Sequence, residues 1–244
     1  MTSVATSAPP KGRGAALDAF LRGPALGLVR NCVRWVITSY FRVFYGFTVE
    51  NAPDRRSLGP VVFAPNHVSF ADPLLMQGAW PDHLTFLMTE KIYRFPPLHW
   101  FFKLWGAIPV PDGGAVKATS IKDALRAIRA GRKVVIFPEG KISVDGYLDV
   151  GAPGVAALMA RARVPVIPVA ILGSYAVLPY RANFPRIARI TVRFGPAIPP
   201  PEGELDREGL RRFAAHVMDA IAALGAPRRP APATAEGAAP PASV

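Results

Sequence analysis

Short apolar runs with the length of strands recur along the chain, separated by stretches with helical periodicity. The strand-like runs lie at 47–50, 61–64, 84–88, 133–137, 166–172 and 190–194. The helical stretches lie at 17–45, 95–105, 121–131, 153–162 and 210–221, and a further helix begins near residue 72. Strands that alternate with helices predict an α/β sandwich. At 244 residues we expect one main domain with a sizeable core.

A histidine and an aspartate follow the second strand-like run. The run at 61–64 leads into Asn66-His67-Val68-Ser69-Phe70-Ala71-Asp72. Histidine exchanges protons near neutral pH, and a carboxylate on its other ring nitrogen fixes the tautomer and stabilises the imidazolium. Five helical residues would point the two side chains about 140° apart, so they meet only if the chain turns between them.

Asp72-Pro73 provides such a turn, because Asp is a good N-cap and Pro a good first helical residue. Two interpretations stay open at this point. In one, His67 and Asp72 form a pair for proton transfer. In the other, Asp72 only caps a helix and His67 is an ordinary loop residue.

A second polar cluster follows the run at 133–137, in the sequence Pro138-Glu139-Gly140-Lys141. Open α/β sheets bind ligands at the carboxyl ends of their strands. Gly140 allows a backbone to approach a ligand closely, and Lys141 supplies a compact cation suited to phosphate. The alternative is a plain exit from a strand into a loop with exposed charges.

The chain carries a net charge of +12 and a sequence pI of about 10.4, which favours an anionic partner. No zinc-finger spacing or aromatic RNA-binding signature appears, so we expect an anionic membrane surface and no nucleic acid. At 17–45, apolar residues recur at helical spacing beside Arg30, Arg34 and Arg42, as in a helix that lies in the membrane interface. The alternative is a surface helix packed on the core with solvated arginines.

The sequence offers no cleavable signal peptide and no uncharged apolar stretch of spanning length. We therefore expect a peripheral or monotopic protein at the cytoplasmic face of the cell membrane. The single cysteine, Cys32, excludes an internal disulfide and a cysteine metal cluster. The histidines at 83, 99 and 216 have no partner at ligand spacing, so no metal site is expected.

The polar clusters, taken in order, resemble a known family. The pattern Asn66-His67-x-x-x-x-Asp72, then Phe137-Pro138-Glu139-Gly140, then Val164-Pro165-Val166-Ile167-Pro168-Val169 resembles the glycerophospholipid acyltransferases, which include the 1-acylglycerol-3-phosphate acyltransferases. The resemblance covers about residues 45–195. It implies a glycerol-3-phosphate acyltransferase-like fold, with a mixed central sheet flanked by helices. It also implies transfer of a fatty acyl group from acyl-CoA or acyl-carrier protein to a lysophospholipid hydroxyl, without a further cofactor.

The resemblance implies a role for each matching residue. His67 would be the general base on the acceptor hydroxyl, and Asp72 would orient it. Asn66, Glu139, Gly140 and Lys141 would shape the substrate site, and Lys91 stands where the family often has a phosphate-binding lysine. Backbone N–H groups near Gly140 or in the histidine loop are candidates for stabilising the oxyanion.

Two blocks depart from the family pattern. The family usually has an arginine four residues after Gly-x-Ile, where Asp112 stands here, and an arginine in Glu-Gly-Thr-Arg, where this chain has Glu139-Gly140-Lys141-Ile142-Ser143. The segment that begins at Phe137-Pro138-Glu139-Gly140 resembles more closely the acyltransferase half of 2-acylglycerophosphoethanolamine acyltransferase/acyl-carrier-protein synthetases. A lysophospholipid with a headgroup is therefore an option beside lysophosphatidic acid.

No Gly-x-Ser-x-Gly elbow is present, so direct transfer is expected instead of an acyl-enzyme. The alternatives are a non-catalytic lipid-binding protein and a hydrolase that uses the same His/Asp pair. The expected organisation has four parts: a flexible N-terminus at 1–16, a membrane-interface helix at 17–45, the acyltransferase domain at 46–224 and a disordered Ala/Pro-rich tail at 225–244.

Overall fold

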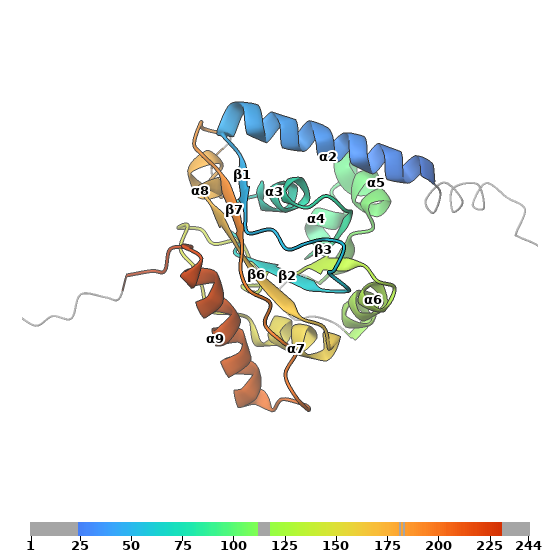
Figure 1. Cartoon of the computed structure of the whole chain (residues 1–244), viewed down its shortest axis with the longest axis vertical. Helices are drawn as coiled ribbons and strands as arrows, with labels where there is room; N and C mark the ends of the chain where they lie inside the picture. The colour runs from blue at the N-terminus through green and yellow to red at the C-terminus, as the bar shows by residue number, and fades with distance from the viewer. Residues whose placement is uncertain (1–23, 112–117, 181, 183, 231–244) are drawn as a thin grey trace, which may run out of the picture.

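The expected alternation of strands and helices is present in the computed structural model, which describes residues 24–111, 118–180, 182 and 184–230 (Figure 1). The strands are β1 (Thr48–Glu50), β2 (Val62–Pro65), β3 (Leu84–Thr89), β4 (Ile108–Val110), β5 (Lys133–Val135), β6 (Val166–Leu172) and β7 (Thr191–Phe194). The helices are α2 (Pro24–Tyr45), α3 (Asp72–Ala79), α4 (Glu90–Tyr93), α5 (Pro96–Trp105), α6 (Ala118–Arg129), α7 (Pro153–Ala162), α8 (Ser174–Val177) and α9 (Arg207–Ala223).

The strands form one mixed seven-stranded sheet in the order β1-β7-β6-β2-β5-β3-β4. Strands β6, β2, β5, β3 and β4 run parallel to one another. Strand β7 pairs antiparallel with β6, and β1 pairs parallel with β7. The carboxyl ends of the five parallel strands therefore lie along one edge of the sheet, which is where ligands bind in folds of this kind.

Helices cover each face of the sheet (Figure 1). A hydrophobic layer lies between the helices and the sheet on each face. Side chains alternate between the two layers along β2, because successive residues of a strand point to opposite faces. Val62 and Ala64 belong to the layer of α6, α7 and α9, whereas Phe63 belongs to the layer of α2, α3 and α5. Phe63 packs against Trp80 with ring centroids 5.0 Å apart. Full burial of side chains of this size stabilises the fold by roughly 1.5–3 kcal/mol each.

Helix α2 lies over α3 with one face inward and one face outward (Figure 1). Leu26, Phe41 and Tyr45 are buried, and the hydroxyl of Thr38 donates to the carbonyl of Gly78 at 3.2 Å. The helix is therefore packed on the core along one side. Within the described ranges, no helix combines the length and the hydrophobicity needed to cross a bilayer.

Sequence and structure differ mainly at short elements and at the C-terminus. Strand β4 and the short helices α4 and α8 were not predicted. The disordered tail predicted from residue 225 starts too early, because Ala226 is buried and the carbonyl of Pro227 accepts from the N–H of Leu148 at 2.8 Å. The expectations for 1–16, for 17–23 and for 231–244 lie outside the described residues.

Candidate active site at the carboxyl ends of the strands

Three neighbouring parallel strands bring the polar clusters together. Strand β2 leads into Asn66 and His67, β5 leads through Phe137 into Glu139, and β6 ends at Leu172. Because β2 lies between β5 and β6, the histidine loop is contacted from both sides. Both polar clusters predicted from the sequence therefore meet at one edge of the sheet.

His67 and Asp72 form a hydrogen-bonded pair. The Nδ1 atom of His67 lies 3.0 Å from Oδ2 of Asp72, and the carboxylate is fully buried. The N–H groups of Val68 and Ser69 donate to the same oxygen at 2.7 and 2.8 Å. The chain thus turns back on the carboxylate, and Asp72 both holds the loop and faces the imidazole.

The predicted N-cap role of Asp72 is wrong. Helix α3 begins at Asp72 itself, and Ala71 occupies the N-cap position without a side-chain cap. The carboxylate points backward to the N–H groups of the preceding loop instead of forward into the helix. Its place in the first turn puts the carboxylate beside the partial positive charge at the N-terminal end of the helix.

The imidazole of His67 is held in a defined orientation. It stacks on the ring of Phe137 with centroids 3.9 Å apart and an angle of 20° between the planes. The His67 side chain is 14% exposed, so the pair is shielded but still reachable. Since Asp72 occupies Nδ1, the other ring nitrogen, Nε2, is the one left to take a proton from a substrate.

Glu139 locks the histidine loop to the loop after β5. Its Oε1 atom accepts from the N–H of His67 at 2.8 Å, and its Oε2 atom accepts from the N–H of Asp149 at 3.1 Å. The N–H of Ser143 in turn donates to the carbonyl of His67 at 2.7 Å. Burial raises the pKa of Glu139 to about 7, against the two N–H donors, which lower it.

Asn66 joins β2 to β6 with its side chain. Its Oδ1 atom accepts from the N–H of Ile171 at 2.7 Å, and its Nδ2 atom donates to the carbonyl of Ile171 at 3.1 Å. The residue is only 1% exposed. We therefore infer that Asn66 positions the histidine loop, whereas the sequence pattern suggested contact with substrate.

Gly140 and Lys141 lie exposed beside the pair, just after Glu139. Gly140 has a φ of +70°, a conformation that other residues rarely adopt, and a Cβ there would lie 3.3 Å from that of Ala152. The Nζ atom of Lys141 lies 2.7 Å from Asp149, and this hydrogen bond raises the pKa of Lys141. Lys141 is therefore a charged group at the rim of the site.

Lys91 approaches the same edge of the sheet from farther away. It lies on α4, which directly follows β3, and β5 separates β3 from β2. Neighbouring strands lie about 4.8 Å apart, so β3, which leads into the helix of Lys91, is about 10 Å from the histidine strand β2. A ligand that spans that distance is needed for both residues to contact it.

Several of the backbone groups expected to stabilise an oxyanion are already in use. The N–H groups of His67, Val68, Ser69 and Gly140 all donate hydrogen bonds within the two loops. These N–H groups therefore build the site and are not free to bind a developing negative charge. In the described part of the chain, no group of three histidine, cysteine, aspartate or glutamate side chains is placed to hold a metal ion.

Sequence reasoning missed Ser69, Ser143 and Asp149. Ser69 donates through its hydroxyl to the carbonyl of Leu178 at 2.8 Å, which ties the histidine loop to the segment after α8. Asp149 connects Glu139 to Lys141. Small polar residues in loops carry no periodicity, so only the position of Ser69 inside the histidine motif provided a signal.

Comparison with known proteins agrees with this geometry. A family model described as Acyltransferase matches residues 46–172, more than half of the chain. A chloroplastic 1-acyl-sn-glycerol-3-phosphate acyltransferase of Brassica napus is 26% identical over 132 residues, which cover 54% of this chain and 38% of that protein. An N-acylphosphatidylethanolamine synthase of Arabidopsis thaliana is 28% identical over 169 residues, which cover 59% of this chain and 58% of that protein. The chain spans less than two thirds of the length of these relatives.

A solved structure shares the fold. The crystal structure of the 1-acyl-sn-glycerophosphate acyltransferase from Thermotoga maritima superposes with a TM-score of 0.67 at 21% identity, over 86% of this chain and 85% of that chain. The predicted fold, a mixed central sheet flanked by helices, is thereby confirmed. With the family model covering more than half of its length, the chain belongs to the acyltransferase family, as its sequence motifs predicted.

Proposed function

We propose that the protein is a lysophospholipid acyltransferase, which moves a fatty acyl group from a thioester donor to the free hydroxyl of a lysophospholipid. The observation that carries this proposal is the His67–Asp72 pair, whose Nδ1–Oδ2 hydrogen bond leaves Nε2 for the acceptor hydroxyl. The pair lies within the part of the chain that matches the family.

The proposed reaction is a direct transfer. The acceptor hydroxyl oxygen attacks the thioester carbonyl carbon while Nε2 of His67 takes the hydroxyl proton. The C–S bond then breaks, the new ester remains, and the imidazolium returns the proton to the leaving thiol. Asp72 holds the tautomer and stabilises the imidazolium. General-base action of this kind contributes about 10²–10⁴-fold in rate, and positioning of the two substrates supplies much of the remainder.

The acceptor is proposed as a class, a lysophospholipid. The similar proteins are named for different chemistry, one as a 1-acyl-sn-glycerol-3-phosphate acyltransferase and one as an N-acylphosphatidylethanolamine synthase. At the rim of the site, Lys141 is exposed and charged, and Lys91 approaches from the same edge. Both lysines suit the phosphate of the acceptor, and acyl-CoA and acyl-carrier protein are the proposed donors.

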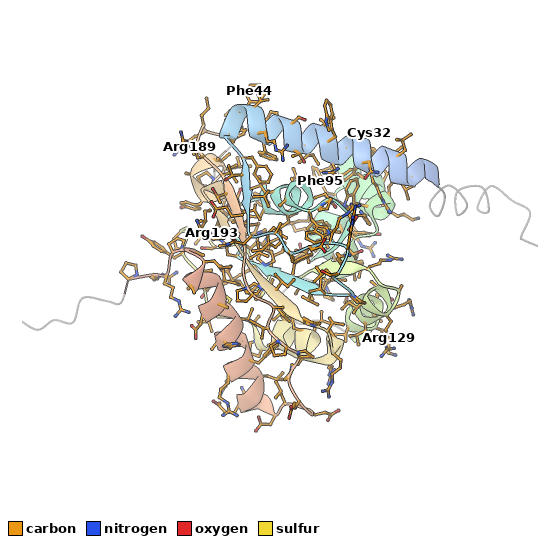
Figure 2. The ribbon with its side chains drawn as sticks, viewed as in Figure 1. Cys32, Phe44, Phe95, Arg129, Arg189 and Arg193 are labelled. Atoms are coloured by element: carbon orange, nitrogen blue, oxygen red, sulfur yellow. The ribbon has the colours of Figure 1, made fainter. Side chains whose placement is uncertain are left out.

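We place the protein at an anionic membrane surface, on the cytoplasmic face of the cell membrane. The outer side of α2 exposes a row of apolar residues, and Phe44 points away from the body of the molecule (Figure 2). The exposed large apolar residues of α2 and of the segment at 95–105 are Leu28, Val29, Trp35, Val36, Tyr40, Val43, Phe44, Phe95, Leu98 and Trp100. Such a concentration is typical of an interaction with lipid or with another protein.

The aromatic segment at 95–105 has one side on the core and one side exposed. Trp105 and Phe101 pack on the core, whereas Phe95 and Trp100 are exposed. A cavity of about 50 Å³ with an apolar lining lies between α3, β3 and α5. We propose that this cavity is the start of the acyl-chain path, and that α5 moves outward when a chain enters.

The test is a panel assay with the purified full-length chain. Acyl-CoA and acyl-carrier-protein donors are each offered with lysophosphatidic acid, lysophosphatidylethanolamine or no acceptor. Formation of a diacyl product with one acceptor supports the proposal and names the headgroup. Donor consumption without any acceptor would instead indicate a hydrolase. Vesicle binding without turnover on any pair would indicate a binding protein.

A further inference from the structure

A second polar site lies at the opposite edge of the sheet from the His67–Asp72 pair. A cleft of about 810 Å³ opens under the amino-terminal half of α2, next to the turn that leads into the amino end of β3. Its walls carry Arg30 and Arg34 from α2, Arg55 from the loop between β1 and β2, and Asp82 and His83 from that turn. Cys32, which also lines the cleft, marks this part of α2 in Figure 2.

Polar atoms in this cleft are buried without a partner. The Nε atoms of Arg30 and Arg34 make no hydrogen bond to the described residues. The ring of His83 has a contact with the backbone of Trp105 that falls short of hydrogen-bond geometry. A buried polar group left unpaired costs about 1–3 kcal/mol, so native structures rarely keep several of them together. Among the described residues, these nitrogens of the cleft lack a full partner.

The cleft has an excess of positive charge. Its one acidic residue among those described, Asp82, is already shared by Arg55 at 3.2 Å and Lys133 at 3.8 Å. Arg30 gives one hydrogen bond to the carbonyl of Leu104 at 2.7 Å. Since a concave surface lined by one sign of charge concentrates counter-ions, the missing partner is an anion.

We propose that this cleft binds a phosphate group, from a phospholipid headgroup or from a soluble phosphate, with Arg30, Arg34 and His83 as the donors. The planar fork of arginine matches the oxygens of phosphate. Burial, and the nearby charge of Arg30, lower the pKa of His83 to about 3, although the backbone carbonyl of Trp105 acts in the opposite direction. His83 is therefore neutral near pH 7 and offers one N–H. The site is independent of acyl transfer and lies outside the machinery around His67.

The test compares cleft variants with a matched control on the same helix. Arg34→Gln removes a charge inside the cleft, whereas Arg42→Gln removes the same charge from an exposed position on α2 outside it. His83→Phe removes the ring nitrogens without changing the net charge at pH 7 and keeps an aromatic ring against Trp105. Arg30 is left unchanged because it also ties α2 to α5.

Two readouts distinguish the source of the phosphate. The first is the shift in melting temperature caused by inorganic phosphate relative to chloride at equal ionic strength. The second is co-sedimentation with phosphatidylcholine vesicles with and without phosphatidylglycerol. Loss of a charge-assisted hydrogen bond predicts a fall of about tenfold in phosphate-dependent binding for Arg34→Gln, and a smaller fall for His83→Phe.

If His83→Phe reduces the shift in melting temperature caused by inorganic phosphate, the ligand is a soluble phosphate. If His83→Phe reduces only the co-sedimentation with vesicles, the ligand is a lipid headgroup. Generic attraction to an anionic surface predicts instead that Arg34→Gln and Arg42→Gln lose equal affinity and that His83→Phe loses none. That pattern in both readouts would overturn the proposal. Neither readout uses turnover, so the result is separate from the proposed acyl transfer.

Discussion

The two edges of the sheet organise their polar groups in opposite ways. At the carboxyl edge, the loop backbone around His67 is paired, and Glu139, Asp72 and Asn66 each accept from backbone N–H groups. At the amino edge, the cleft under α2 keeps arginine and histidine nitrogens buried without partners. Many hydrogen bonds thus hold the loops at the carboxyl edge, although Oδ1 of Asp72 is also buried without a partner among the described residues. At the amino edge, the unpaired nitrogens are those that the proposed phosphate would pair.

The two edges are therefore expected to contribute differently to function and to stability. A reaction that moves a proton needs groups held at fixed distances, and hydrogen-bonded loops supply that rigidity. A binding cleft can keep unpaired donors, because the ligand satisfies them when it arrives. Removing a polar group at the carboxyl edge is therefore expected to lower activity or stability. Removing one at the amino edge is expected to leave stability unchanged or to raise it.

The largest effect is expected for Asp72→Asn. The amide still accepts hydrogen bonds but carries no charge to stabilise the imidazolium, so turnover should fall about 10²–10⁴-fold. Steady-state rates measure the loss of turnover, and the melting temperature of the same preparation measures any loss of stability. A variant that keeps turnover within about tenfold and only melts earlier would reduce Asp72 to a structural role.

A large loss of stability is expected for Asn66→Ala. The substitution leaves the buried N–H and carbonyl of Ile171 without their partners, which costs about 2–4 kcal/mol for the two groups. Unfolding in urea measures this, with Asn31→Ala on the exposed side of α2 as the control. Equal stability of the two variants would show that the connection between β2 and β6 does not hold the histidine loop.

Glu139 should make stability depend on pH. Its pKa rises from 4.5 in the unfolded chain to about 7 in the fold, so the folded state holds the proton more tightly. The contribution of Glu139 to the free energy of unfolding is therefore fully present below pH 4.5. It decreases as the pH rises from 4.5 to about 7, and above pH 7 it no longer changes. The fall is about 3 kcal/mol, since one pKa unit corresponds to about 1.4 kcal/mol.

Glu139→Gln cannot ionise and should remove that part of the pH dependence. The free energy of unfolding of both proteins, measured across this pH range, gives the difference directly. If the difference in the free energy of unfolding between wild type and Glu139→Gln does not change from pH 4.5 to 7, Glu139 is ionised in the fold throughout this range.

The smallest effect, of opposite sign, is expected for Arg34→Met in the absence of phosphate. Removing a partly buried cation with an unpaired nitrogen should leave stability unchanged or raise it by up to about 1 kcal/mol. Chemical unfolding in chloride buffer is the measurement. A loss above about 1 kcal/mol would show that Arg34 is already paired when the cleft is empty.

Much of the carboxyl edge was predictable from the sequence. A strand-like run followed by His67 and Asp72 requires only local spacing, and the strand periodicity placed Glu139 at the same edge. The exact use of Glu139 was not predictable, because its partner, the N–H of His67, lies 72 residues away. Asp72 was assigned to its helix as a cap, since sequence alone does not tell in which direction a carboxylate points.

The amino edge was not predictable for a different reason. Arg30, Arg55 and His83 come from three separate segments, and no spacing connects them. Arg30 and Arg34 suggested only a basic helix at a membrane, and His83 was considered only as a metal ligand. Their common cleft depends on how α2 packs over the sheet, which is a tertiary property.

The central claim is that His67 is the general base of an acyl transfer. The most direct test compares wild-type protein, His67→Ala and the exposed control His216→Ala in a single-turnover transfer assay with the best donor and acceptor. The account predicts that His67→Ala loses about 10²–10⁴-fold in rate with an unchanged melting temperature, while His216→Ala keeps its activity. Transfer by His67→Ala within about tenfold of wild type would contradict it.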